Sequence, residues 1–245
     1  MTAWKGQRRA IGAAIGALLV AIAVIAGVIA KSGPEPLPER APGERPQLLL
    51  LTSLPIVFPE ELTLDAERTA ALTALQSRYE VAPISVADTP SLRGHQLLLI
   101  AQPQAQPAEY LVQLDRWVRS GGHVLLLADP ALEWPSDRPL GDVTRPPRAF
   151  ADTGLLLHWG VRLDAPDQRG SASADTADGT VETASPGTVV AVQDNCTVGE
   201  GGLIAHCRVG EGAATIVADA DFIHVDSADS GNLQLLLREL DQLER

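Results

Sequence analysis

The chain opens with its longest apolar stretch. Residues 11–30, IGAAIGALLVAIAVIAGVIA, contain no polar or charged side chain, and a helix of this length spans roughly 30 Å, the thickness of a bilayer's hydrocarbon core. Three basic residues precede the stretch and one follows it: Lys5, Arg8, Arg9 and Lys31. Because positively charged flanks stay in the cytoplasm, the pattern predicts a cytoplasmic N-terminus over residues 1–9, one transmembrane helix over residues 10–30, and export of the rest.

Two other interpretations of this stretch remain open. A secretory signal peptide has an apolar part of about 7–15 residues before a small-residue cleavage site. Val28-Ile29-Ala30 offers such a site, although the apolar stretch is longer than a signal peptide needs. A buried globular helix would keep some polar positions. The uncleaved anchor fits best, and the scarcity of lysine beside abundant Ala, Arg and Pro is typical of a GC-rich bacterium. We therefore expect a single-pass protein of a bacterial inner membrane, with a periplasmic C-terminal domain.

The pattern of an α/β domain begins after a polar segment. Residues 31–46 are rich in Pro, Glu and Arg, which predicts an extended linker. The domain itself is expected over residues 47–245. Its first half contains four short apolar runs of the kind found in strands buried on both faces. These runs are residues 48–51, 81–86, 96–101 and 124–128.

Amphipathic segments separate the apolar runs. One helix is expected to start at Asp65, a second follows Pro107 and stops at Gly121-Gly122, and a third covers residues 150–159. Strands that alternate with helices, each strand apolar throughout, predict a mostly parallel sheet that is doubly wound, with helices on both faces.

The C-terminal half has shorter elements and more glycine. Residues 165–187 consist largely of Ala, Ser, Asp, Thr and Gly, and predict a mobile loop. Strands with Gly-rich turns follow over residues 188–192, 195–198, 203–209 and 213–218. We therefore expect an antiparallel β-hairpin insertion over residues 188–212. A leucine stripe predicts a last helix over residues 232–243, capped by Asp229 or Ser230.

The chain has two cysteines, both in the part expected to be exported. If Gly201-Gly202 form a two-residue hairpin turn, Cys196 faces Cys207 on the neighbouring strand. In an oxidising compartment this register predicts a disulfide. Two unpaired core cysteines, or a metal pair helped by the adjacent His206, are the alternatives.

Charge excludes one class of partner. After Lys31 the chain has 31 acidic residues and 15 arginines, a net charge of about −16. Such a surface repels phosphate backbones and anionic headgroups, so we expect no nucleic-acid partner.

Several segments resemble a known family. HQLLLIAQPQAQPAEYLVQLDRWVRSGGHVLLLADP, at residues 95–130, resembles the strand, helix, Gly-Gly, strand core of glutamine-amidotransferase-like domains. More narrowly, the chain is similar to the exported domain of the gliding-motility and related ABC-transporter auxiliary family, in which a helix closes on WGV, here Trp159-Gly160-Val161. GEGAATIVADADFI and GNLQLLLRELDQL are similar to that family's closing strand and helix. The resemblance covers residues 47–163 and 209–243.

The resemblance implies a domain with an amidotransferase- or flavodoxin-like fold. It also implies a protein that lies in the membrane beside transport systems and belongs to a family not known for enzyme activity. An active glutamine amidotransferase needs a nucleophilic Cys or Ser on the elbow after the strand that follows the Gly-Gly pair. Here that strand ends in Ala128-Asp129-Pro130. His224-Val225-Asp226 is similar to the His-x-Glu pair of that fold, but has no nucleophile to activate. We therefore expect no catalytic residue and no enzyme activity.

A ligand site, if present, has a predictable place. Open parallel sheets bind ligands at the carboxyl ends of their strands, where the strand order switches direction. The small or polar residues expected there are Thr52, Ser53, Gln102, Asp129 and Asp221. Residues of these types are also common wherever a strand passes into a loop.

Two arrangements of carboxylates in the sequence offer rival interpretations. The acidic stretch from Asp219 to Gly231 supplies ligand types for a cation, but its spacing misses the calcium-loop pattern. The ligand types in that stretch are Asp219, Asp221, His224, Asp226 and Asp229. Glu60-Glu61 with Asp129 would make a hydrolase-type pair, although nothing in the sequence places them together. We expect no metal and no cofactor.

These observations predict a non-catalytic, membrane-anchored accessory or scaffold protein. Its expected partners are the membrane and integral-membrane subunits of a transporter or envelope complex. The alternative is a degenerate small-molecule-binding module that uses the strand ends.

Overall fold

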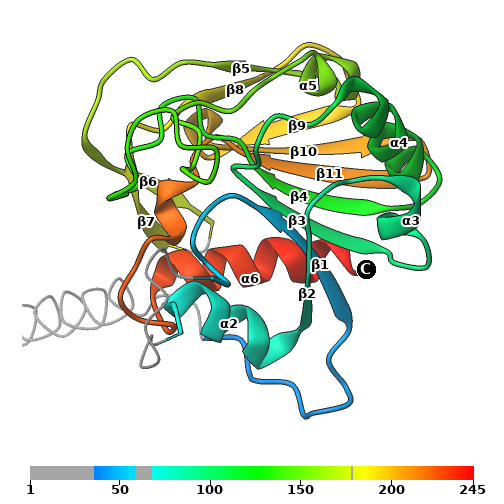
Figure 1. The fold of residues 1–245 in the computed structure, drawn as a ribbon. Helices are drawn as coiled ribbons and strands as arrows, with labels where there is room; N and C mark the ends of the chain where they lie inside the picture. Colours follow the sequence, from blue (N-terminus) through cyan, green and yellow to red (C-terminus); the bar gives the residue numbers. More distant parts are fainter. Residues whose placement is uncertain (1–35, 59–67, 178) are drawn as a thin grey trace, which may run out of the picture. The chain divides into compact units, whose positions relative to one another are not determined.

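The computed structural model describes residues 36–58, 68–177 and 179–245 (Figure 1). Within these ranges, no helix is both long and apolar enough to cross a bilayer. The predicted cytoplasmic N-terminus over residues 1–9 and the predicted transmembrane helix over residues 10–30 lie outside the described residues.

A seven-stranded sheet forms the centre of the domain, in the order β2-β1-β3-β4-β11-β10-β9 (Figure 1). The strands are β1 Gln47–Thr52, β2 Glu80–Ile84, β3 Leu97–Ala101, β4 His123–Leu127, β9 Cys196–Gly199, β10 Ile204–Val209 and β11 Gly212–Val217. Strands β2, β1, β3, β4 and β11 are parallel, whereas β10 is antiparallel to both of its neighbours. The predicted mixed α/β fold with a mostly parallel sheet is confirmed.

Helices cover both faces of this sheet. The helices are α2 Ala70–Arg78, α3 Thr89–Leu92, α4 Ala108–Arg119, α5 Leu155–Trp159 and α6 Gly231–Leu243. The two core layers explain why residues 48–51 of β1 are all apolar. Leu48 and Leu50 pack in the layer with α2 and α6. Leu49 and Leu51 pack in the opposite layer, with α3, α4 and α5. Successive side chains of a strand point to opposite faces, so a strand between two helix layers is apolar throughout.

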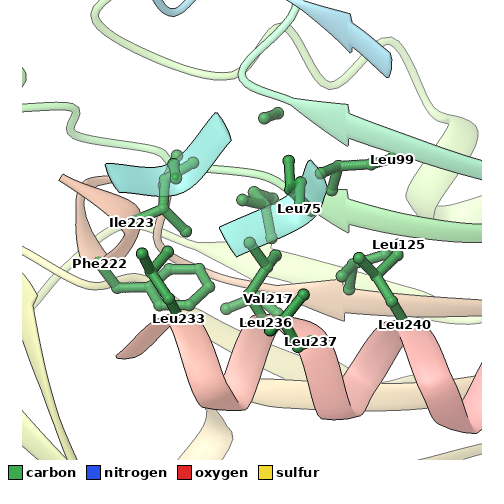
Figure 2. Packing of buried hydrophobic residues seen from close by; sticks show 14 of the residues in the cluster. Leu75, Leu99, Leu125, Val217, Phe222, Ile223, Leu233, Leu236, Leu237 and Leu240 are labelled. Carbon is green, nitrogen blue, oxygen red and sulfur yellow. The ribbon is translucent and has the colours of Figure 1, made fainter. Parts of the chain in front are cut away.

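Helix α6 closes one of these layers. Figure 2 shows its leucines directed toward the sheet, where they meet Leu99, Leu125 and Val217, and toward Leu75 of α2. Five leucines of α6 are at most 2% exposed: Leu233, Leu235, Leu236, Leu237 and Leu240. Ser230 caps the helix by accepting a hydrogen bond from the backbone N–H of Leu233, one of the two caps predicted.

Two predicted helices have different limits in the structure. Helix α5 begins only at Leu155, because Gly154 has a φ of +93° and interrupts the chain before it. Helix α2 begins at Ala70 and is capped by Thr69, whereas the predicted start, Asp65, lies outside the described residues.

The prediction of a mobile loop over residues 165–187 is wrong. Strands β6 Ser171–Thr176 and β7 Gly179–Ala184 form an antiparallel hairpin there. Residues 171–184 are mostly polar, so the sequence lacks the alternation of apolar and polar residues that would predict these two strands. The hairpin is held from elsewhere in the chain: Asn232 of α6 accepts a hydrogen bond from the N–H of Glu182 and donates one to its carbonyl.

The predicted β insertion over residues 188–212 is divided between two sheets. Strand β8 Thr188–Ala191 pairs with β5 Val161–Asp164 in a separate antiparallel pair, whereas β9 and β10 extend the central sheet. The turn between β9 and β10 is a 3₁₀ turn, η1 Glu200–Gly202, and is longer than the two residues predicted.

The register of β9 and β10 nevertheless places Cys207 opposite Cys196, and the two sulfur atoms are bonded, 2.01 Å apart. The predicted disulfide is confirmed, and the unpaired and metal-bound alternatives are wrong.

Residues 36–46 are the part of the predicted extended linker, residues 31–46, that the structure describes, and we call them the strap. The strap has no helix or strand, but it lies against α2 and α6. The backbone N–H of Arg40 donates to the carbonyl of Ser77 at 3.0 Å, and the N–H of Leu37 donates to Gln234 Oε1 at 2.9 Å. Polar bonds to the domain, which a Pro-rich composition does not reveal, hold it in place.

Candidate functional site

The five predicted site residues do meet at one edge of the sheet. Thr52 is aligned with Ala101 across β1 and β3, and Ala101 with Leu127 of β4, so these strands end together. Strand β11 is parallel to β4 and ends level with it. The strand order switches direction at β1, because β2 lies on one side of β1 and β3 on the other. This is the edge at which doubly wound sheets bind ligands.

The hydroxyl groups at the end of β1 are used within the protein. Thr52 Oγ1 donates to the carbonyl of Ala101 at 2.8 Å and accepts from the N–H of Leu54 at 2.9 Å. Ser53 Oγ donates to the carbonyl of Gln102. These bonds join the end of β1 to the end of β3, so both hydroxyls stabilise the strand exits.

Gln102 is fully buried and joins β3 to the loop after β4. Its side chain accepts from the N–H of Asp129 at 3.0 Å and donates to the carbonyls of Asp129 and Pro147 at 3.1 and 3.0 Å. Its backbone has a φ of +41°, a conformation that residues other than glycine rarely adopt. Strain of this kind persists only where surrounding contacts hold the residue, as the three hydrogen bonds do here.

Asp129, Asp219 and Asp221 form the one group of three or more His, Cys, Asp or Glu side chains among the described residues whose ligand atoms lie close enough together for a metal ion. One carboxylate oxygen from each lies within 4.8 Å of one from each of the others, and the three residues are 0%, 0% and 9% exposed. Asp129 follows β4, whereas Asp219 and Asp221 follow β11. The parallel pairing of β4 with β11 brings together residues 90 positions apart. We call this group the aspartate cluster.

Backbone N–H groups surround the aspartate cluster. Asp129 accepts from Ala131 at 2.7 Å and from Ala220 at 3.0 Å. Asp219 accepts from Phe222 at 2.7 Å and from Ala184 at 3.0 Å. Asp221 accepts from Glu133 at 2.7 Å. Five carboxylate oxygens are thus bonded to the main chain, and together they fasten the loops after β4, β7 and β11.

Burial changes the protonation of this cluster. It raises the pKa of Asp219 to about 8, with a further contribution from the negative charge of Asp129. It also raises the pKa of Asp221 to about 7, against the effect of the hydrogen bond from Glu133. Burial raises the pKa of Asp129 as well, opposed by the N–H groups of Ala220 and Ala131. Ionising all three buried carboxylates would place like charges close together in a medium of low polarity, which is energetically unfavourable. The cluster therefore retains protons near neutral pH.

Sequence reasoning missed two residues beside the cluster. The carboxylate of Glu133 accepts from the hydroxyl of Ser185 and from the N–H of Gly170, while its own N–H donates to Asp221. Ser185 is fully buried and has a φ of +51°. The adjacent Pro186-Gly187 is a turn signal, but nothing local connects it with Glu133.

The other ligand types of the acidic stretch, for which no metal site was predicted, lie apart from the cluster. Asp226 and Asp229 are exposed, and the ring of His224 stacks on Trp134 with centroids 4.5 Å apart. Burial lowers the pKa of His224, opposed by the charge of Asp226. Of the acidic stretch, only Asp219 and Asp221 join the cluster. Glu60 and Glu61 lie outside the described residues.

Two grooves flank this edge of the sheet. The first, of about 580 Å³, lies at the ends of β1 and β2 and is lined by Ser53, Phe58 and Val143, among others. The second, of about 460 Å³, lies between α4 and α5 and is lined by Val112 and Leu155, among others. Gln106 lines both grooves. Phe58 and Val143 are 71% and 85% exposed, unusually high values for large apolar side chains.

Comparison with known proteins gives one family match. The family model described as ABC-type uncharacterized transport system matches residues 45–168, from the end of the strap through β5. No curated protein sequence matches the chain.

Similar folds occur among solved structures. The exo-beta-1,4-mannosidase Op5Man5 from Opitutaceae bacterium strain TAV5 is 15% identical, with 82% of this chain and 34% of that chain covered and a TM-score of 0.48. The mmIFT52 N-terminal domain is 14% identical, with 80% and 97% covered and a TM-score of 0.49. Cytoplasmic protein STM1381 from Salmonella typhimurium LT2 is 13% identical, with 79% and 99% covered and a TM-score of 0.49. This chain spans about a third of the mannosidase, and likenesses of this degree carry no argument about function.

Proposed function

The chain belongs to the ABC-type uncharacterized transport system family, and from this premise we propose that it is a non-catalytic accessory subunit of such a system. In this proposal residues 10–30 anchor it in a bacterial inner membrane and the domain lies in the periplasm, where it binds other subunits. The observation that carries the proposal is the family match, which spans about half of the chain and includes β1 to β4.

The chemistry of the strand ends supports a role without catalysis. Asp129 stands at the elbow after β4, where an amidotransferase-type enzyme needs a nucleophile. Its carboxylate oxygens both accept backbone N–H groups, and the hydroxyls of Thr52 and Ser53 both donate to carbonyls. The parallel strand order β2-β1-β3-β4-β11 is consistent with a doubly wound domain of amidotransferase or flavodoxin type. We propose that such a scaffold is used here for binding alone.

The surface supports a protein partner. Three of the six exposed large apolar side chains among the described residues line the two grooves, Phe58 and Val143 in the first and Val112 in the second. Contiguous exposed apolar surface marks interaction sites on soluble domains. We assign these grooves to contacts with a membrane-spanning subunit of the transport system.

Affinity capture tests the proposal directly. The full chain, tagged at its C-terminus and extracted in a mild detergent, should co-purify with a membrane-spanning subunit and an ATPase in fixed proportion. The double substitution Phe58→Ser and Val143→Ser should reduce this recovery. Val192→Ser is the matched control, because Val192 is 42% exposed and lines neither groove. Purification of the unaltered chain as a monomer without subunits would count against the proposal.

The membrane topology needs its own experiment. A reporter that is active only after export, fused to the C-terminus, should be active in cells, and the fusion should remain with the membrane after carbonate washing. A C-terminal reporter that works only in the cytoplasm would refute the periplasmic placement.

A second candidate function rests on the first groove. Its volume of about 580 Å³ is within the range of small-molecule sites, and it lies at the switch point of the strand order. If it binds a small molecule, a ligand screen should yield a compound that raises the melting temperature, and Phe58→Ala should abolish that increase. Absence of any such compound favours the accessory role.

A further inference from the structure

We propose that the strap, residues 36–46, is a releasable clasp that sets the length of the tether between the membrane anchor and the domain. The tether part of this inference rests on the proposed function, because it requires residues 10–30 to lie in a membrane. The clasp itself is argued from contacts within the described residues.

Arg40 is the centre of the clasp. Its guanidinium group donates to Asp241 Oδ1 at 2.9 Å and to Glu244 Oε1 at 3.0 Å, both near the end of α6. The same group lies over the ring of Tyr79, 5.1 Å from its centroid, which is a cation–π geometry. One strap side chain therefore contacts α6 and the residue that ends α2.

Asp241 connects this contact to the interior. It accepts two hydrogen bonds from Arg78 Nη2, at 2.6 and 2.8 Å, and one from the Tyr79 hydroxyl at 3.3 Å. Arg78 is 5% exposed and also donates to the carbonyl of Pro38 in the strap. If the strap detaches from the domain, Arg78 keeps its ion pair with Asp241. Opening therefore does not leave a buried charge without a partner.

The rest of the strap is held by few bonds. The N–H of Leu37 donates to Gln234, and the carbonyl of Pro46 accepts from the N–H of Glu80 at 2.9 Å. The bond from Arg45 Nε to the carbonyl of Arg40 lies within the strap. None of residues 36–46 is buried, and only Leu37 packs against the core. An element with little buried apolar surface opens far more easily than the whole domain unfolds. Its ion pairs are partly exposed and are weakened by salt.

Opening would lengthen the tether considerably. The strap contains 11 residues, counted from 36 to 46. At about 3.3 Å per residue, a released and extended strap spans up to about 36 Å before the first strand, more than the same residues span while they are folded against the domain. A closed clasp keeps the domain near the membrane, and an open one lets it reach a partner farther away.

Hydrogen exchange on the full chain in detergent tests the clasp. The Arg40→Gln substitution removes both ion pairs and the cation–π contact but leaves Arg78 paired with Asp241. We expect the strap amides of Leu37 and residue 40, which donate to Gln234 and to the carbonyl of Ser77, to exchange about tenfold faster, with no change in β3. High salt should accelerate the same amides in the unaltered protein and have little effect in the variant.

Two further variants make the result specific. Glu244→Gln removes one ion pair and should produce a smaller acceleration in the strap. Arg162→Gln breaks the exposed ion pair with Asp164, far from the strap in sequence, and should leave strap exchange unchanged. Strap exchange in Arg40→Gln equal to that of the unaltered protein would overturn the clasp.

Energy transfer from a fluorophore at Val143→Cys to labelled lipids in a nanodisc tests the tether. Both native cysteines are in the disulfide, so the new thiol is labelled selectively. Transfer should fall in Arg40→Gln. If the strap amides of Arg40→Gln exchange faster but energy transfer to the lipids is unchanged, the clasp opens without changing the distance to the membrane. That result would overturn the control of tether length but not the clasp itself. Failure of the full chain to enter nanodiscs would instead overturn the proposed anchor, and the exchange experiment would still decide the clasp.

Discussion

Replacing Asp221 by Asn should stabilise the folded domain at pH 8. Asp221 is buried beside Asp129 and Asp219, and its pKa is raised from 3.8 to about 7. Its Oδ2 atom accepts from the N–H of Glu133. An asparagine can accept the same hydrogen bond through its oxygen and present an amide N–H to Asp129, which resembles the protonated acid.

The sign follows from proton linkage. The folded state holds the Asp221 proton up to about pH 7, whereas the unfolded chain releases it near 3.8. Between these values the folded state binds more protons, so stability falls as the pH rises. At about 1.36 kcal/mol per pKa unit, raising the pH from 5 to 8 removes at most about 3 kcal/mol through this one group. Asp219, with a pKa of about 8, extends the same trend to higher pH.

Urea unfolding followed by tryptophan fluorescence, on the full chain in detergent at several pH values, measures this effect. The unaltered protein should lose stability from pH 5 to pH 8. Asp221→Asn should be more stable than the unaltered protein, and its gain at pH 8 should exceed its gain at pH 5 by at most about 3 kcal/mol. Asp226→Asn, an exposed neighbour in the same acidic stretch, is the control and should change neither value. If Asp221→Asn is less stable than the unaltered protein at pH 8, the account of the aspartate cluster is wrong.

Three further predictions concern the core, the disulfide and the cluster. Leu236→Ala should cost about 2–5 kcal/mol in urea unfolding because Leu236 is fully buried under the sheet, whereas Leu140→Ala, at a position 77% exposed, should have little effect. Reduction of the Cys196–Cys207 disulfide, or its replacement by two serines, should lower stability by about 3 kcal/mol on the loop-entropy estimate, measured with and without reductant; equal stability in both would show that the bridge is dispensable. Millimolar Mg²⁺ or Ca²⁺ should not raise the melting temperature, because five carboxylate oxygens of the cluster already accept backbone N–H groups; a rise that Asp219→Asn abolishes would identify a cation site instead.

Local patterns in the sequence predict the parallel half of the sheet well. Strands β1, β3 and β4 lie between two helix layers, so each is a continuous apolar run that needs no knowledge of the rest of the chain. The disulfide could also be predicted, because its register depends on a short turn. Strands β6 and β7 could not, since their stability comes from Asn232 and Asp219, which lie in other parts of the chain.

The aspartate cluster shows the same limit. Asp129 and Asp221 were correctly expected at the carboxyl ends of strands, but their contact depends on β11 pairing with β4. No local pattern states that the last strand of the chain enters the sheet at that place. The contacts of the strap could not be predicted for a similar reason. A Pro-, Glu- and Arg-rich composition predicts an extended linker, whereas Arg40 bonds to Asp241 and Glu244, about 200 residues later at the end of α6.

The position of β11 has a consequence for how the molecule is made. This strand is the last in the sequence, yet it lies inside the sheet between β4 and β10, and α6, which follows it, covers one face. Before residues 212–243 have been synthesised, β4 therefore has one unpaired edge, and the apolar face of the sheet that α6 covers remains exposed. A polypeptide cut at the limits of the family match, residues 45–168, should aggregate rather than fold. The domain can become complete only when nearly its entire length has been synthesised.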